Sequence, residues 1–96
     1  MTEAQKHLRE AIAHWEARHA PLYSSAALRE EQRQELADAA AAIARGDAAA
    51  ARPVLERWRS YHQYTGDWAD TLSAGFAHHR LAELMAAALQ ALDSGD

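Results

Sequence analysis

Apolar side chains recur near the start of the chain at the spacing of an α-helix. The stripe consists of Leu8, Ile12, Trp15, His19 and Leu22, at intervals of four, three, four and three positions. This spacing predicts an amphipathic helix over residues 3–20, with the stripe facing a core. Thr2 and Gln5 are arranged as a capping box at its start. Pro21 disfavours helical geometry at the preceding residue, so Leu22 is expected to pack from the loop.

The second predicted helix spans residues 26–45. Ser24 or Ser25 can cap its start, and Gly46 suits the left-handed position that follows a helix. The first half of this helix is charged, whereas the second half is an alanine run without an apolar stripe. We expect the smooth half to pack closely against another helix of the same chain.

Proline and glycine define the third predicted helix. Pro53 has no amide proton and would damage a helix interior, so the helix is expected to begin there. It then runs over residues 53–64 and ends before Gly66. Trp58 and His62 share its inner face.

The longest predicted helix spans residues 68–92, with Asp67 as its N-cap. Its expected core stripe comprises Trp68, Leu72, Phe76, His79, Ala82, Met85, Leu89 and Leu92. Gly75 lies inside this helix, and its missing side chain is expected to admit a bulky neighbour such as Trp15 or Trp58.

Four helices joined by short loops predict an all-α fold, a single small domain built as an antiparallel four-helix bundle. The chain has 96 residues, of which 25 are alanine. Because alanine buries little area, the core is expected to be thin. A protein partner or a homo-oligomer would compensate for such a core, and we expect one or the other.

Charge and composition exclude several classes of function. The net charge is −4, and 10 basic residues alternate with 14 acidic ones, so no basic surface for nucleic acid is predicted. No apolar run reaches the roughly 20 residues of a membrane span, and the first residues lack a signal core, so a cytoplasmic location is expected. The absence of cysteine excludes disulfides, thiolate metal sites and a cysteine nucleophile.

Six histidines raise the question of a metal site. Glu3, His7, Glu10 and His14 share one side of the first helix, away from its apolar stripe, so they are interpreted as a solvated face. His78 and His79 are adjacent and point to different sides, so they cannot chelate one ion together. We expect no metal bound by this chain and no catalytic residue; a proton-transfer role for His62 is weaker than a hydrogen-bonded structural one.

Four of the seven aromatic side chains fall between residues 52 and 72. A guanidinium near aromatic rings suits an interface anchor or a bidentate anion contact. The residues expected to bind a partner or a ligand are Arg52, Arg57, Trp58, Tyr61, Tyr64 and Trp68. Whether the aromatic cluster forms a core or a site is left open by the sequence.

The order of three motifs resembles the helical amino-terminal region of nitrile hydratase β subunits and their small accessory relatives. These motifs are Trp15-Glu16-Ala17-Arg18, Arg52-Pro53-Val54-Leu55-Glu56-Arg57, and the series Tyr61, Tyr64, Trp68 and Leu72. The resemblance implies a β-type or accessory partner of a separate subunit, whose cysteine loop binds cobalt or iron. It also implies that Arg52 reaches that loop and that Tyr61, Tyr64 and Trp68 line the interface or the substrate path.

The segment from Tyr64 to Asp67, followed by Leu81-Ala82-Glu83, is similar to closing segments of the helical drug-binding domains of TipAS type. That resemblance implies a stacking cleft made by Trp58, Tyr61, Trp68 and Phe76. The sequence therefore favours a non-catalytic interaction protein, with a module that binds small aromatic molecules as the alternative.

Overall fold

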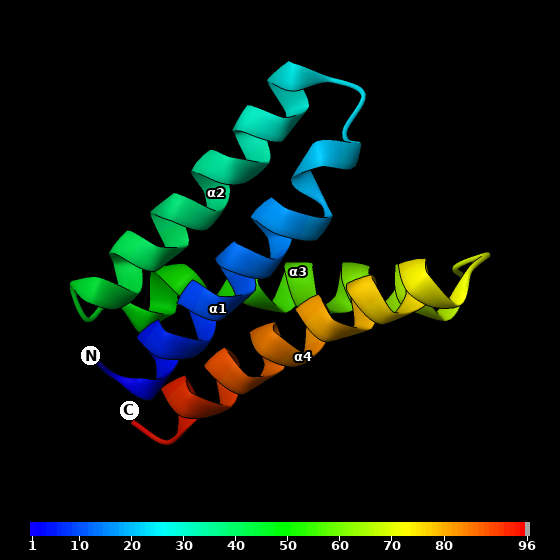
Figure 1. Ribbon diagram of the computed structural model, residues 1–96. Coiled ribbons are helices and arrows are strands. Elements are labelled where there is room, and N and C mark those ends of the chain that lie inside the picture. The colour runs from blue at the N-terminus through cyan, green and yellow to red at the C-terminus, as the bar shows by residue number, and fades with distance from the viewer. Residues whose placement is uncertain (96) are drawn as a thin grey trace.

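Two helical hairpins make up the computed structural model, which describes residues 1–95. The first pairs α1 (Glu3–Arg18) with α2 (Ala26–Ala44), and the second pairs α3 (Ala48–Asp67) with α4 (Leu72–Asp93) (Figure 1). A single 3₁₀ turn, η1 (Ala20–Leu22), follows α1. No strand occurs in residues 1–95. The predicted all-α, antiparallel four-helix bundle is confirmed.

Side-chain caps begin the first two helices as the sequence predicts. The Thr2 hydroxyl accepts from the amide of Gln5 at 3.1 Å, and the Gln5 side chain accepts from the amide of Thr2 at 2.8 Å. Ser25 caps α2 by accepting from the amide of Leu28 at 3.1 Å. Gly46 has φ +81°, the left-handed conformation expected after α2.

The third helix begins earlier than predicted and runs through Pro53. Asp47 caps it, because its carboxylate accepts from the amide of Ala50 at 3.1 Å. Proline removes the hydrogen bond to the carbonyl of Ala49, but Ala49 and Pro53 are both exposed, so water can satisfy that carbonyl. The prediction that the helix starts at Pro53 is therefore wrong.

The turn between α3 and α4 also differs from the prediction. Gly66 and Asp67 belong to the end of α3, and the cap of α4 is Thr71, whose hydroxyl accepts from the amide of Ala74 at 3.1 Å. Gly66 is therefore helical and does not end the helix. The space at Gly75 faces the backbone of Gly66 and not a tryptophan, so that expectation is wrong too.

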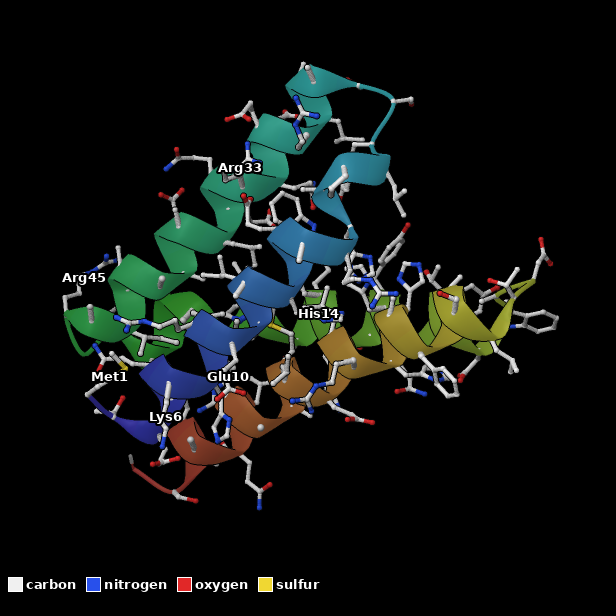
Figure 2. The ribbon with its side chains drawn as sticks, in the orientation of Figure 1. Met1, Lys6, Glu10, His14, Arg33 and Arg45 are labelled. Atoms are coloured by element: carbon white, nitrogen blue, oxygen red, sulfur yellow. The ribbon has the colours of Figure 1, made fainter. Side chains whose placement is uncertain are left out.

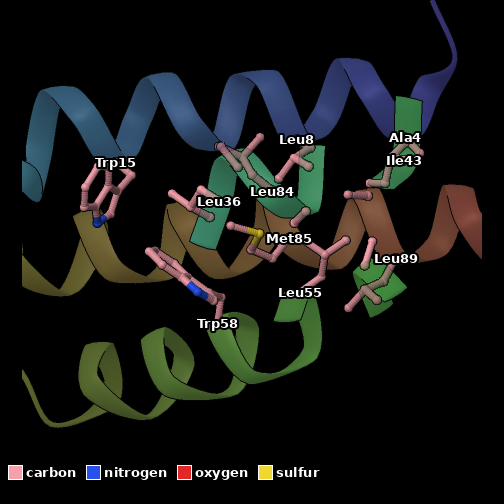
Figure 3. Close-up of a cluster of buried hydrophobic side chains, with 14 of the residues drawn as sticks. Ala4, Leu8, Trp15, Leu36, Ile43, Leu55, Trp58, Leu84, Met85 and Leu89 are labelled. Carbon is pink, nitrogen blue, oxygen red and sulfur yellow. The ribbon is translucent and has the colours of Figure 1, made fainter. Parts of the chain in front are cut away.

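Leucine, methionine and tryptophan side chains from all four helices meet in one core (Figure 3). The largest fully buried side chains are Trp15, Leu8, Leu36, Leu55, Leu81 and Met85. Alanines with no exposed surface complete it on α1, α3 and α4. In the alanine run of α2, Ala39 and Ala42 are buried against this core, as expected, whereas Ala41 and Ala44 are exposed.

The two hairpins meet at one end and diverge towards the other, which gives the molecule the outline of a fork (Figure 1). At the closed end lie residue 1, the α2–α3 turn and the end of α4. There, Arg52 of α3 donates to the carboxylate of Asp93 at 2.5 Å, and residues of α1 and α4 border one shallow groove. None of the helices in the described chain is both long enough and apolar enough to span a membrane.

Four residues assigned to the core by the sequence lie on the surface. Leu22, Trp68, Leu72 and Phe76 are 80%, 74%, 80% and 69% exposed. The last three lie at the turn between α3 and α4, helices of 20 and 22 residues, whereas α1, which packs on α4, has 16. The longer hairpin therefore extends past the helix that would cover it. Tyr23, not Leu22, packs against the core from the first turn.

Candidate functional site

Trp58, one of the predicted site residues, belongs to the core. It is 4% exposed, and its ring meets that of Trp15 edge-on with 6.0 Å between the centroids. Its indole N–H donates to the carboxylate of Glu35 on α2. Trp58 therefore joins α3 to the first hairpin and presents little surface to a partner.

The two arginines of the predicted site lie in different parts of the molecule. Arg57 is exposed and pairs with Glu35. Arg52 is half-buried, pairs with Asp93, and is separated from Trp68 by 16 residues, about 24 Å along a helix. The structure thus separates the predicted set into Arg52 at the closed end, the buried Trp58, Arg57 paired with α2, and an exposed aromatic group.

That exposed group surrounds the free end of the α3–α4 hairpin. Tyr61, Tyr64 and Trp68 are 61%, 65% and 74% exposed, and the rings of Tyr64 and Trp68 lie 6.3 Å apart. Leu72 and Phe76, on the first turns of α4, are 80% and 69% exposed. We call these five residues the aromatic tip.

A cleft lies in the fork, between the first hairpin and α3. Its volume is about 370 Å³, and it is lined by Tyr23, Leu28, Gln32, Arg57, Trp58, Tyr61 and His62. This volume lies at the lower end of the range found for small-molecule sites. Of the four aromatic residues expected to form a stacking cleft, Trp58 and Tyr61 line this one.

Three histidines from three elements converge beside the cleft. His19 follows α1, His62 lies on α3 and His78 on α4, and each offers a ring nitrogen within 4.8 Å of the others. His19 and His62 are 5% and 4% exposed, and His78 is half-buried. We call this group the histidine cluster.

Hydrogen bonds orient the rings of the cluster. The Nδ1 atoms of His62 and His78 face each other at 2.8 Å. His14 and His19 each donate from Nε2 to the carbonyl of Ala77, at 2.8 and 3.1 Å. His14 is thus placed between α1 and α4 (Figure 2), and its assignment to a solvated face is wrong. All buried side-chain nitrogen and oxygen atoms in the described residues are hydrogen-bonded.

Burial keeps the cluster uncharged. Removal from water lowers the pKa of His62 from 6.5 to about 3 and that of His19 from 6.5 to about 4, with further lowering by the neighbouring histidines. The pKa of His78 is also lowered, mainly by burial. At neutral pH all three rings are therefore uncharged imidazoles, which is the form that accepts a proton or binds a metal ion.

Sequence reasoning found the inner positions of this cluster but not the cluster itself. His19 and His62 both fall on predicted inner faces, whereas nothing in the sequence links His78 to either of them. The expectation that His78 and His79 point to different sides is confirmed: His79 donates to Asp67 at 2.8 Å, away from His62. The sequence feature that could have indicated the cluster is the presence of a histidine on the core side of more than one helix.

Comparison with family models, curated proteins and solved structures finds no match to this chain.

Proposed function

We propose that the protein is a non-catalytic helical interaction subunit that binds a partner protein through its aromatic tip. The observation that carries the proposal is the exposure of Tyr61, Tyr64, Trp68, Leu72 and Phe76, each between 61% and 80%, at one end of the molecule. Single exposed apolar residues are ordinary, but several large ones on the same hairpin favour a binding surface. Aromatic side chains are also the commonest anchors of protein interfaces.

The most concrete form of this proposal is a β-type or accessory subunit of a nitrile hydratase-like metalloenzyme. Tyr61, Tyr64 and Trp68, which carry part of that resemblance, belong to the aromatic tip. The partner is then the subunit whose cysteine loop holds cobalt or iron. Arg52 is paired with Asp93 at the closed end, so the proposal rests on the aromatic residues and not on Arg52.

Affinity capture from the native cells tests this proposal. The tag is placed at the amino terminus, at the closed end of the fork (Figure 1). We expect a stoichiometric companion with a cysteine-rich metal loop, and loss of that companion in the double variant Trp68→Ser/Phe76→Ser. Leu22→Ser is the matched control, because Leu22 is equally exposed but lies on the other hairpin. Both variants should remain folded, since they alter exposed positions.

Three results would contradict the proposal. A companion captured equally well by the double variant would place the interface elsewhere. A homodimer in sedimentation that dissociates in the double variant would make the tip a contact between copies of this chain. A folded monomer without any companion would remove the interaction function.

A second candidate function is the binding of a small aromatic molecule in the fork cleft. It is favoured by the cleft of about 370 Å³, which Trp58, Tyr61 and Tyr23 line with aromatic surface. A panel of aromatic antibiotic-like compounds can be titrated while tryptophan emission is followed. Binding that weakens at least about tenfold in Tyr61→Ala, but not in Tyr64→Ala, would support this function. No saturable change with any compound would count against it.

A further inference from the structure

We propose that His19, His62 and His78 form a binding site for a divalent transition-metal ion, with zinc as the best fit. The site lies inside the molecule, where α3 and α4 meet the end of α1, and the ring of Tyr61 packs edge-on against that of His62 with 5.0 Å between the centroids. It would make the chain a metal-binding protein in its own right, which its sequence does not predict.

The spacing of the ring nitrogens suits one ion. Zinc–nitrogen bonds are about 2.0–2.1 Å, so two nitrogens on a tetrahedral zinc ion lie about 3.3 Å apart. The Nδ1 atoms of His62 and His78 are 2.8 Å apart, and all three ligand atoms lie within 4.8 Å of one another. The three nitrogens are therefore close to the spacing that one ion requires.

The hydrogen bond of His19 prepares that ring for a metal ion. Only a protonated nitrogen can donate to the carbonyl of Ala77, so Nε2 carries the hydrogen and Nδ1 keeps its lone pair. Metal-binding histidines commonly hold their other nitrogen in this way, through a backbone carbonyl or a carboxylate. In the facing pair, the ring that has its hydrogen on Nδ1 moves it to Nε2 when the metal binds, so no net proton is released.

The chemistry of the group selects the kind of ion. Its three ligands are imidazoles, without carboxylate or thiolate, which favours zinc, copper, nickel or cobalt over magnesium and calcium. Three protein ligands also leave a fourth position for water or for a ligand from outside the chain. His62 lines the fork cleft as well, so the cleft gives the cluster contact with solvent.

Burial of the cluster supports a role beyond packing. An apolar side chain could fill the positions of His19 and His62 without the cost of taking polar ring atoms out of water. Because burial also lowers the pKa values of all three rings, protons do not compete with a metal ion at neutral pH.

Titration of chelator-treated protein with Co²⁺ and Zn²⁺ tests the site. The protein must carry no histidine tag. We expect one ion per chain, with the intense visible absorption of four-coordinate Co²⁺ that Zn²⁺ abolishes. His78→Gln should weaken binding about 100-fold or more, because it removes one of three ligands from a half-buried position that tolerates glutamine. His7→Ala, which removes a histidine of the α1 surface, is the control and should bind as the wild type does.

A second measurement keeps the test decisive if a cluster variant does not fold. In the nuclear magnetic resonance spectrum of the wild type, Zn²⁺ should shift the imidazole nitrogens of His19, His62 and His78. A shift confined to His7 and His79 would overturn the proposal, as would the absence of binding by folded wild-type protein or equal binding by His78→Gln. The variant Trp68→Ser/Phe76→Ser should keep full metal affinity, which separates this site from the proposed interaction function.

Discussion

The ring of His79 occupies the space in which any residue other than glycine at position 66 would place its Cβ atom. A carbon added there would be 2.4 Å from Cδ2 of His79 and 2.7 Å from Nε2, the atom that donates to Asp67. Gly75, on the facing helix, has more room, because an added carbon would meet the carbonyl of Gly66 at 3.4 Å. Of these two helical glycines, only Gly75 has room for the Cβ atom of an alanine.

We predict that Gly66→Ala lowers the free energy of unfolding by up to about 1 kcal/mol, because displacing the half-exposed His79 ring and its bond to Asp67 outweighs the gain in helix propensity. Gly75→Ala should be neutral or should stabilise by up to about 1 kcal/mol, since alanine is the better helix former. Urea denaturation of the two variants measures both effects. Adding His79→Ala to Gly66→Ala should recover most of the loss, and equal stability of the two single variants would contradict this account.

At the residue scale, the helical period predicted the burial of some side chains correctly and of others wrongly. Trp58 is spaced to share the inner face of α3 with His62, and it is buried. Trp68 and Phe76 fit an apolar stripe equally well, yet both are exposed. An apolar stripe shows which residues share one side of a helix. The length of the neighbouring helix decides how many residues of that stripe are covered and buried. That length is a property of the assembled fold.

At the element scale, α3 contains a proline in its sixth position. The helix is held at its start by the Asp47 cap and continues through Pro53 because the affected turn faces solvent. The sequence predicts caps well where a side chain and its amide are close in sequence, as at Thr2 and Ser25. It fails at Pro53, since the tolerance of a proline depends on exposure of the carbonyl four residues earlier.

We predict that Pro53→Ala raises the free energy of unfolding by about 1–3 kcal/mol, because it restores the hydrogen bond to Ala49. Asp47→Ala should lower it by about 0.5–2 kcal/mol through loss of the cap. Thermal denaturation followed by circular dichroism measures both. If Pro53→Ala were strongly destabilising, the ring of the proline would have to contribute packing that its exposed position does not suggest.

For the whole molecule, the histidine cluster makes stability depend on pH. The pKa values of His19 and His62 are about 4 and 3 in the folded chain, and near 6.5 when unfolded. The unfolded chain thus takes up protons first as the pH falls below about 6.5, and stability is lost from there downwards. The groups that face these rings are His14 and Arg18 of the α1 segment and His78 of α4, and none is an acid that would oppose the loss.

We predict that the melting temperature of the metal-free protein falls by roughly 5–10 °C or more between pH 7 and pH 5, a window above the range in which most carboxylates titrate. His62→Phe should flatten this dependence, whereas His7→Ala should leave it unchanged. Calorimetry in the presence of a chelator measures it. A melting temperature that is constant over this window would show that the buried histidines are not held uncharged.

The all-α bundle could be predicted at this scale from four amphipathic segments and short loops. The fork and the convergence of His19, His62 and His78 could not, because they depend on the angle between the two hairpins. Helical period fixes the side of each helix on which a histidine lies. It does not fix which turns of different helices meet.

The closed end of the fork brings the start of α1 and the end of α4 together, where Glu3, His7, Gln90 and Ser94 border one groove. A domain whose first helix starts beside the end of its last helix can be inserted into a surface loop of another protein without straining either chain. The free ends of the two hairpins would then point away from the host (Figure 1). The fold is thus suited to insertion as a domain into a host protein, with the open end of the fork exposed to solvent.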